Sequence, residues 1–329
     1  MRAVWIREPG PADRHAVEEV PGPVAGPGEV VVDIKAAAVN YPDLLVITGR
    51  YQVVPPMPFA PNKDAAGIVH SVGTDVTRVK PGDRVLLQLE YGAYATQALA
   101  REAQCLPVPP EMGYADAVSL GLAAQTAWFA LMERGRFEAG ESVLVNGATG
   151  AVGLAAVQIA RALGATVLAG ISSPARTDDM LKAGAHHAID FSAPDLRNSL
   201  RDQVLKATGG KGADVVIDAL GGDIFDASLR ALAWCGRIVV VGFAAGRIPE
   251  IKANYLLVKN IAASGLQWSD YRDREPWKIA HAHEALMGLW QRGELRPSIM
   301  RSVPLDDFAQ ALRLIEARSA TGRLVLAMD

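Results

Sequence analysis

Apolar and polar residues follow two different patterns along the chain. In the first third, short β-branched runs are separated by frequent proline and glycine and occupy 30–34, 67–73 and 84–89. Short strands with many turns predict an irregular, barrel-like β domain. From about Val118, alanine- and leucine-rich segments alternate with compact β-branched runs at 142–145, 167–171, 215–217 and 238–241. This alternation predicts βαβ units around a parallel sheet.

The segment after 142–145 has the periodicity of an amphipathic helix. Its apolar positions recur at helical spacing at Val152, Ala156, Ile159 and Leu163. Gly164 follows where a glycine at the end of a helix is expected. After an apolar run at 261–266, the pattern predicts helices over roughly 276–292 and 306–318 and a final strand over 323–327.

The run at 142–145 leads into a glycine-rich turn and then into this helix. A dinucleotide pyrophosphate binds backbone N–H groups at a helix N-terminus, where a side chain would block its approach. Gly147 is therefore expected to supply the tight turn and Gly150 the close contact, while Gly153 allows the helix to pack on the strand. The N–H donors are assigned to Ala151 and Val152. The usual G-x-G-x-x-G template has alanine at its first place here, and no P-loop lysine follows.

The residues after the second strand of this unit indicate which nicotinamide cofactor the turn binds. A site for NAD has Asp or Glu about 20 residues beyond the glycines. This chain has Ser172, Ser173 and Arg176 there and no carboxylate from 170 to 176. Hydroxyls and a guanidinium suit a 2′-phosphate, so NADPH is the predicted cofactor. Helix capping by the serines and a solvated surface role for Arg176 remain the alternatives.

Composition narrows the function classes. Lys+Arg 33 against Asp+Glu 36 gives a net charge of -3, without the basic footprint expected for nucleic-acid or membrane partners. The two cysteines, Cys105 and Cys235, predict a reduced, cytoplasmic protein with buried, inert thiols. The sequence contains neither an H-E-x-x-H metal motif nor a G-x-S-x-G hydrolase elbow. We also expect no export signal.

Several short motifs follow one another in a characteristic order. They are AVNYPD at 38–43, GRY at 49–51, PNKDAAG at 61–67, VKPGDRV at 79–85, QTAW at 125–128, the glycine turn, and ATGR at 320–323. Together they resemble the zinc-independent quinone oxidoreductases of the medium-chain dehydrogenase/reductase superfamily, over essentially the whole chain. The resemblance implies an α/β fold in which a doubly wound Rossmann domain (121–261) is inserted in a GroES-like, β-rich catalytic domain (1–120 plus 262–329).

The resemblance also bears on metal use. Zinc enzymes of the superfamily have Gly-His-Glu where this chain has Asn62, Lys63 and Asp64, and a cysteine-containing segment where it has 40–43. Both ligand positions are lost, in agreement with the cysteine and histidine content. Lys63 and Asp64 are expected to pair with each other, and Asp43 to form a structural hydrogen bond or salt bridge.

By position, the resemblance implies three residues at the reaction site, in a cleft between the domains. Asn40 and Tyr51 correspond to residues near the nicotinamide and substrate, and Thr126 to a residue beside the carboxamide. The alternatives are that Asn40 braces the turn that follows it, that Tyr51 packs or lies at a rim, and that Thr126 is an ordinary helix hydroxyl.

The resemblance assigns further cofactor contacts. Gly242 and Phe243 follow the fifth strand and would contact the nicotinamide half, and Arg323 falls where a basic residue approaches the cofactor phosphates. Phe191 is a departure, because many relatives have a tyrosine there that helps hold the 2′-phosphate. The serines and Arg176 are left to carry the preference for NADPH.

The predicted reaction is metal-free hydride transfer from NADPH to a quinone or to the β-carbon of an enone. A substrate with an electrophilic conjugated system is easier to reduce without a Lewis acid. The developing oxyanion is expected to be held by donors such as Asn40 or Tyr51, and the proton to come from solvent or a tyrosine.

Two alternatives remain. One is an enoyl-thioester or 2-alkenal reductase, for which basic residues are needed at the mouth of the cleft; the candidates are Arg50, Lys63, Arg272 and Arg274. The other is an NADPH-binding sensor or scaffold with little turnover. Resemblance further implies a homodimer whose Rossmann sheets pair edge to edge, with 246–257 near that edge.

Overall fold

The structure, a computed structural model, describes residues 1–317, 319–320 and 322–328. They form two compact units. Unit 1 comprises Met1–Leu122, Tyr271–His283 and Pro297–Asp329, and unit 2 comprises Ala123–Asp270 and Glu284–Arg296. Unit 1 is therefore built from both ends of the chain. Two predicted positions, Arg318 in the last helix and Thr321 in the last motif, lie outside the described residues.

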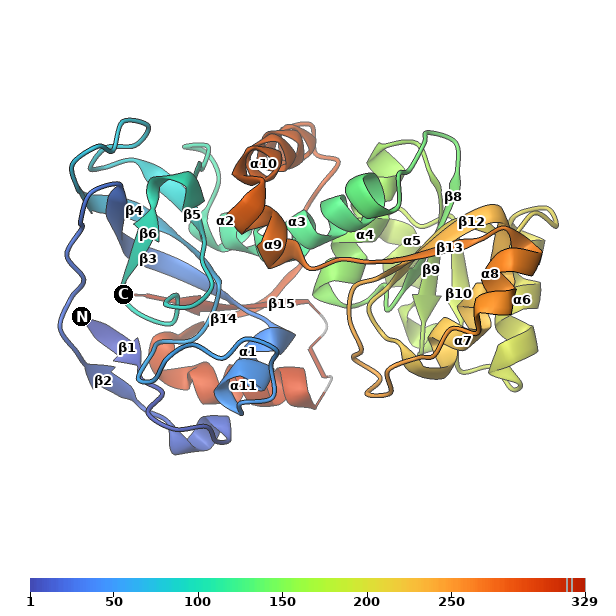
Figure 1. The fold of residues 1–329 in the computed structure, drawn as a ribbon, viewed down its shortest axis with the longest axis horizontal. Helices are drawn as coiled ribbons and strands as arrows, with labels where there is room; N and C mark the ends of the chain where they lie inside the picture. The colour runs from blue at the N-terminus through green and yellow to red at the C-terminus, as the bar shows by residue number, and fades with distance from the viewer. Residues whose placement is uncertain (318, 321, 329) are drawn as a thin grey trace. The chain divides into compact units, whose positions relative to one another are not determined.

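Unit 1 is organised around a seven-stranded sheet (Figure 1). Its order is β14-β15-β3-β4-β5-β7, with β6 also paired to β3, and β1 and β2 form a second, two-stranded sheet. The strands are β1 (Arg2–Val4), β2 (Val17–Glu19), β3 (Glu29–Val39), β4 (Asp64–Val72), β5 (Arg84–Gln88), β6 (Gln97–Arg101), β7 (Cys105–Pro107), β14 (Ile299–Pro304) and β15 (Arg323–Ala327). The C-terminal β15 thus lies between β14 and the N-terminal β3.

Short helices complete unit 1. They are α1 (Tyr41–Ile47), α2 (Tyr114–Ser119), α11 (Phe308–Glu316) and the 3-10 turns Ala12–Arg14, Glu102–Gln104 and Leu305–Asp307. One hydrophobic core joins β3 to the C-terminal tail, with Val32 and Ile34 in the same cluster as Leu312 and Leu326. Burial of these apolar side chains fixes the tail to the N-terminal strands.

Unit 2 contains a six-stranded sheet in which every neighbouring pair is parallel (Figure 1). The order is β10-β9-β8-β11-β12-β13. The bounds are β8 (Ser142–Asn146), β9 (Thr166–Ile171), β10 (His187–Asp190), β11 (Ala213–Asp218), β12 (Leu232–Val240) and β13 (Ala262–Gly265). The chain builds outward from β8, first on one side and then on the other, so the topological switch point lies between β8 and β11. The predicted α/β class with a doubly wound parallel sheet is confirmed.

The helices of unit 2 pack on this sheet. They are α3 (Leu122–Phe129), the π-helix Ala130–Arg134, α4 (Ala151–Ala162), the 3-10 turn Pro174–Arg176, α5 (Thr177–Lys182), α6 (Leu196–Ala207), α7 (Gly222–Ala231) and α8 (Ala253–Lys259). Helices α6 and α7 share a core cluster with Leu144, Leu168 and Val216 of the sheet. β8 and β11 are buried along their whole length, as expected for parallel strands with both faces covered.

Two further helices, α9 (Trp268–Arg274) and α10 (Pro276–Gln291), each contain a point where the chain passes from one unit to the other. Within the part of the chain that the structure describes, no helix is both long and apolar enough to cross a membrane.

The two cysteines differ from each other. Cys105 is buried, as predicted, and burial raises the pKa of its thiol to about 12. The prediction of a buried thiol is wrong for Cys235, which is exposed. The cause is an irregularity in β12, whose register with β11 jumps from Leu232 opposite Ala213 to Arg237 opposite Val215. The extra residues bulge outward, and Cys235 adopts φ 59 within them.

Candidate active site

The predicted glycine turn joins β8 to α4, and two of its glycines are required by the fold. Gly147 has φ 77, and a Cβ there would lie 3.1 Å from the Leu220 side chain. A Cβ on Gly153 would lie 2.1 Å from the Gly147 carbonyl oxygen, which is backbone and has little freedom to move. The start of α4 therefore packs directly against the turn, as the sequence predicts.

Gly150 is different, because the fold does not need a glycine there. It is the N-cap residue of α4 with φ -78, and a Cβ would approach the Gly147 oxygen to only 3.4 Å, an ordinary contact. Its missing side chain instead leaves the N-terminus of a 12-residue helix open. The first-turn N–H groups, which include those of Ala151 and Val152, have no partners within the helix. This open helix end fits an anionic pyrophosphate.

The three residues predicted to bind a 2′-phosphate follow the next strand, β9. Ser172 and Ser173 are exposed. Ser173 is the N-cap residue of a 3-10 turn, yet its hydroxyl makes no capping hydrogen bond, so capping does not account for it. Arg176 Nε lies 2.8 Å from an Asp179 carboxylate oxygen. Hydroxyls and a guanidinium are thus grouped at the carboxyl end of β9, with Asp179 as a competitor for the arginine.

Phe191 lies against the same strand. Its Cζ would be 2.1 Å from a Cβ on Gly170, so the ring packs on the β9 backbone just before the two serines. The side chain is 7% exposed. The aromatic position is therefore set by packing, and the phenylalanine offers no hydroxyl to a phosphate.

Sequence reasoning missed a buried polar group at the switch point. The Asn146 amide donates to Asp218 Oδ1 at 2.7 Å and to the Ser228 hydroxyl at 3.0 Å. The Gly221 N–H donates to the other Asp218 oxygen at 2.9 Å. Burial raises the pKa of Asp218, although the hydrogen bonds from Asn146 and Gly221 lower it. The available signal was a polar residue at the end of an apolar parallel strand, Asn146 in SVLVN and Asp218 in ADVVID.

Gly242 and Phe243 follow β12 at the same edge of the sheet. The Gly242 N–H lies 3.4 Å from the Asp218 carbonyl oxygen, which ties this loop to the end of β11. Phe243 is 37% exposed. The carboxyl ends of parallel strands beside a switch point form the usual ligand site of such sheets. All of the predicted cofactor residues except Arg323 follow these strand ends.

Unit 1 holds a second buried polar group, centred on Asp43. This carboxylate is 2% exposed and belongs to the first turn of α1. One of its oxygens accepts hydrogen bonds from the Asn40 N–H at 2.8 Å, the Asn62 amide at 2.9 Å and the Tyr94 hydroxyl at 2.8 Å. Burial raises the pKa of Asp43 to about 6, although all three donors lower it. The predicted structural role of Asp43 agrees with this geometry.

Strand register brings Arg323 to the same place. Leu324 of β15 lies opposite Val39 of β3, so the residue before Leu324 meets the residue after Val39. The Arg323 guanidinium donates to Asn40 Oδ1 at 3.1 Å and is 6% exposed. It also lies 3.9 Å from a carboxylate oxygen of Asp64, which begins the neighbouring strand β4. Contact of Arg323 with cofactor phosphates stays a prediction.

Asp64 is fully buried. Its Oδ2 accepts the Leu122 N–H at 3.0 Å, and a Cβ on Gly121 would lie 2.1 Å from its Oδ1, so Gly121 must be a glycine. Burial raises the pKa of Asp64 to about 7, and the charge of Arg323 opposes that shift. Within the described chain, Oδ1 has no hydrogen-bond partner, and neither has the amide of Gln88, which lies opposite Asp64 on β5.

Lys63 and Asp64 are drawn to different side chains: Lys63 to Glu90, and Asp64 to Arg323. The Lys63 ammonium pairs with Glu90 and lies 4.9 Å from the centroid of the Tyr51 ring. Arg272 pairs with the same Glu90 at 3.0 Å. Asp64 begins β4, whereas Lys63 lies in the bend before this strand, directly after Asn62 with φ 78.

The predicted reaction-site residues are thus distributed over both units. Asn40 and Tyr51 belong to unit 1, and Thr126, which is 9% exposed, belongs to α3 of unit 2. Asn40 is the N-cap residue of α1, and its amide donates to the Ala38 carbonyl oxygen at 3.3 Å. Sequence reasoning missed Tyr94, which carries no local signal.

In the residues that the structure describes, there is no group of three or more His, Cys, Asp or Glu side chains able to hold a metal ion.

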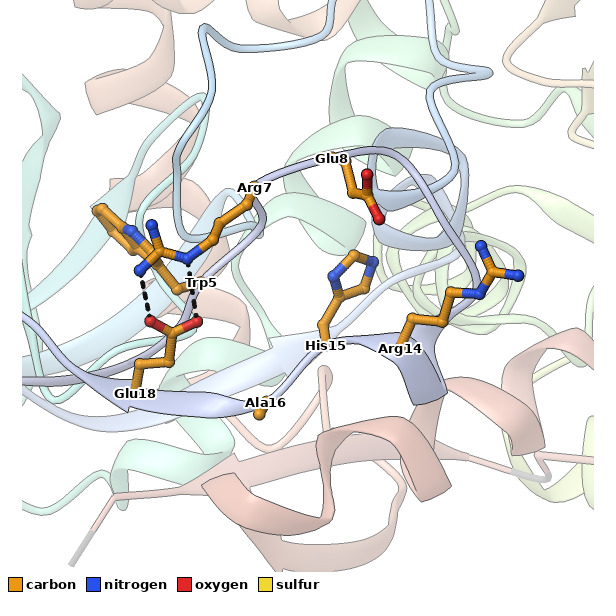
Figure 2. Close-up of a pocket in the computed structure, with 7 residues that line it drawn as sticks. All are labelled: Trp5, Arg7, Glu8, Arg14, His15, Ala16 and Glu18. Atoms are coloured by element: carbon orange, nitrogen blue, oxygen red, sulfur yellow. Dashed lines mark hydrogen bonds and ion pairs between the residues drawn. The ribbon is translucent and has the colours of Figure 1, made fainter.

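A surface hollow of about 420 Å³ lies beside β1 and β2 in unit 1 (Figure 2). Arg7 and Glu18, two of its lining residues, are ion-paired at 2.7 Å, and His15 is within 3.4 Å of the Gly10 carbonyl oxygen. The hollow contains none of the predicted site residues.

Comparison with known proteins agrees with this geometry. Residues 26–129 match the family model of the alcohol dehydrogenase GroES-like domain, and residues 151–283 match that of zinc-binding dehydrogenase. Mouse quinone oxidoreductase-like protein 2 is 38% identical over 94% of this chain and 88% of its own length. Mouse quinone oxidoreductase is 34% identical over 99% of this chain and 97% of its own length.

Solved structures give the same result. Escherichia coli quinone oxidoreductase complexed with NADPH superposes with a TM-score of 0.91 at 26% identity, covering 99% of this chain and 100% of that one. A probable oxidoreductase from Mycobacterium abscessus reaches 0.88 at 33% identity, covering 99% and 98%. The chain is an NAD(P)H-dependent oxidoreductase by this fold and these relatives, and it belongs to the zinc-independent, quinone oxidoreductase-type branch of the medium-chain dehydrogenase/reductase superfamily.

Proposed function

We propose that this protein uses NADPH to reduce quinones or other conjugated carbonyl compounds without a metal ion. The observation that carries the proposal is the buried polar group of unit 1. Asn62, Lys63 and Asp64 occupy the place of a metal-ligand motif, and each is engaged in hydrogen bonds or ion pairs with other side chains of unit 1. A site that offers donors but no metal ligand set suits a substrate that is already electrophilic.

Unit 2 holds the cofactor in this proposal. The open start of α4 at Gly150 binds the pyrophosphate, and Ser172, Ser173 and Arg176 bind the 2′-phosphate. Phe243 and Thr126 lie against the nicotinamide half. When bound, the reduced nicotinamide supplies the hydride.

Unit 1 holds the substrate oxygen. Asn40 is fixed by Arg323 on its amide oxygen and by Asp43 on its backbone N–H, so its position is set before any ligand binds. Tyr51 is half-buried and offers a hydroxyl. These two residues hold the oxygen that becomes negative as the hydride arrives, and their fixed positions reduce the reorganisation needed in the transition state.

The enoyl-thioester alternative is less well supported. Its basic candidates would need to meet the phosphates of coenzyme A. Two of them, Lys63 and Arg272, have side chains only 4% and 6% exposed and share Glu90. Each of these two cations is therefore already paired with a carboxylate, which lessens its attraction for a phosphate group.

The deciding experiment follows oxidation of NADPH and of NADH with 1,4-benzoquinone, 9,10-phenanthrenequinone, a 2-alkenal and crotonyl-CoA in parallel. We expect turnover with the quinones and a higher kcat/KM for NADPH than for NADH. Turnover with crotonyl-CoA alone would favour the thioester reductase. Cofactor binding without turnover of any of the four would favour the sensor or scaffold.

We also propose that the protein is a homodimer. β13 is one of the two edge strands of the parallel sheet, and an edge strand has backbone groups that can pair with a strand of another chain. Ile248, Leu257 and Val258, near this edge in the chain, are 68%, 78% and 76% exposed. Light scattering after size exclusion should give the mass of two chains, and a monomer at micromolar concentration would contradict the dimer. The cytoplasmic location stays a prediction from cysteine usage.

A further inference from the structure

The side chains around Lys63 form a polar cluster inside unit 1, and the proposed function gives a role in the reaction to only one of them, Tyr51. We define it as Lys63, Tyr51, Glu90, Arg272 and Asp273. The side chains of Lys63 and Arg272 are 4% and 6% exposed, whereas that of Glu90 is 24% exposed. Burying two cations is costly, so their presence here needs a reason.

Holding Glu90 in place does not supply that reason. Arg272 already pairs with Glu90 at 3.0 Å and donates to its neighbour Asp273 at 2.8 Å. It also donates to the Leu89 carbonyl oxygen. Glu90 would therefore be anchored without Lys63, whose charge balances the second of the two carboxylates, Glu90 and Asp273.

The backbone around Lys63 is fixed on both sides. Asn62 before it has φ 78 and donates to Asp43, and Asp64 after it accepts the Leu122 N–H. Lys63 therefore extends from the same buried group that positions Asn40. Its ammonium lies over the ring of Tyr51, the residue assigned to the substrate oxygen.

We propose that Lys63 is the catalytic residue that protonates the substrate oxygen. This inference rests on the proposed function. As the hydride adds to the conjugated system, an electron pair moves onto the carbonyl oxygen; one N–H bond of Lys63 breaks and an O–H bond forms on that oxygen. The neutral amine that remains takes a proton from water by way of Glu90, whose partial exposure reaches solvent. For a quinone, one hydride and one proton give the hydroquinone.

The charges facing Lys63 suit this role. Burial lowers the pKa of the ammonium, and so does the charge of Arg272, while Glu90 and Asp43 raise it. Asp273 and the hydroxyl of Tyr51 are the other titratable groups of the cluster. A lysine whose pKa is lowered gives up a proton more readily near neutral pH than an exposed one. Activity that needs the protonated form is lost as pH rises through the pKa of Lys63.

The test compares Lys63→Met and Lys63→Arg with the wild-type protein. We expect kcat/KM for 9,10-phenanthrenequinone to fall about 100-fold or more in both, the usual scale for loss of a general acid. The wild-type profile should decline at alkaline pH, and the variants should lose that decline. Lys278→Met is the matched control, because Lys278 also contacts an aromatic ring, that of Tyr271, and pairs with Glu275 at 3.3 Å. It should keep wild-type activity.

A second readout does not depend on turnover. 4-Nitrophenol, bound in the presence of NADP⁺, reports by absorbance whether a phenol at the substrate position ionises. An adjacent ammonium favours the phenolate, so the wild type and Lys63→Arg should lower the apparent pKa of the bound probe and Lys63→Met should not. Arginine keeps the charge and does not release a proton, which separates charge from proton donation.

The outcomes separate the two proposals. Wild-type turnover of quinone together with unchanged activity and pH profile in Lys63→Met overturns the inference and leaves the proposed function standing. Absence of wild-type turnover overturns both. If Lys63→Met does not fold, as judged by circular dichroism, Lys63→Arg decides, since retained activity in that variant also contradicts proton donation.

Discussion

The two polar regions of this protein are built in opposite ways. In unit 2, the predicted cofactor residues follow the carboxyl ends of the parallel strands, and Gly150, Ser172 and Ser173 are exposed. In unit 1, the group around Asp43 is buried, and its members hold one another. The residues of the first region are expected to bind an anion independently of one another, whereas those of the second hold each other in place by hydrogen bonds. Changes in the first should therefore affect binding, and changes in the second should affect folding.

The largest effect is expected for Asp43→Ala. It leaves three donors at Asn40, Asn62 and Tyr94 without their acceptor inside the core. Breaking such a group costs roughly 3–5 kcal/mol of the free energy of unfolding. Urea denaturation measures the loss. Asp306→Ala is the control, because its ion pair with Arg2 is exposed and should contribute less than about 1 kcal/mol.

A pair of glycine variants sharpens the contrast within unit 2. Gly153→Ala drives a Cβ to 2.1 Å from the Gly147 oxygen, so both stability and NADPH affinity should fall, each by roughly 2–3 kcal/mol. Gly150→Ala has room in the fold at 3.4 Å and a backbone conformation open to alanine, so only affinity should fall. Thermal denaturation and fluorescence titration with NADPH separate the two. Equal destabilisation by both would contradict the role assigned to Gly150.

The 2′-phosphate contacts give a smaller effect. Arg176→Ala should weaken NADPH by roughly 1.5–3 kcal/mol and hardly change NADH, since the lost contact is to a charged group. Asp179→Asn should act in the opposite direction, because it releases Arg176 from its ion pair at 2.8 Å. Titration of each variant with both cofactors measures the ratio. Equal weakening of NADPH and NADH by Arg176→Ala would show that the arginine does not bind the phosphate.

The smallest effect is a dependence of unit 1 on pH. The pKa values of Asp43 and Asp64 are raised in the folded state to about 6 and about 7, above the ordinary value of 3.8. The folded protein therefore binds more protons than the unfolded chain in this interval, and its free energy of unfolding falls as pH rises from about 4 towards 7. We expect on the order of 1 kcal/mol per carboxyl between pH 5 and 6.5.

Hydrogen exchange of β3 and β15 peptides, corrected for the intrinsic rate, measures this dependence. Asp43→Asn should make it shallower. A free energy of unfolding that rises over the same pH interval would contradict the raised pKa values.

The sequence predicted much of the fold because its signals are local. The periodicity of α4, the strand at 323–327 and the glycine turn each depend on residues within a few positions of one another. The predicted residues of unit 2 meet for the same reason, since each follows a parallel strand and such strands end at one edge. Asp43 also had a local signal, because it follows Asn40 by three residues, the spacing of a helix-capping pair.

The buried group of unit 1 had no such signal beyond Asp43. The separation between Asn40 and Arg323 is 283 residues, and only the register of β15 on β3 brings them together. Likewise, adjacency in the sequence predicted that Lys63 pairs with Asp64, whereas the structure pairs Lys63 with Glu90. The exposure of Cys235 depends on a bulge in β12. Strand register and bulges are decided by packing between distant segments, which one stretch of sequence does not contain.

By itself, then, the sequence determined the class of fold and the family, and it predicted which residues bind a nicotinamide cofactor, because strand, turn and helix signals are short-range. Only the tertiary structure decided which charges are buried and which groups face one another. It placed Lys63 over Tyr51 and beside Glu90, and this arrangement carries the proposed proton transfer. The physical reason is that burial and pairing are properties of the packed chain, and they set the cost and the reactivity of each charge.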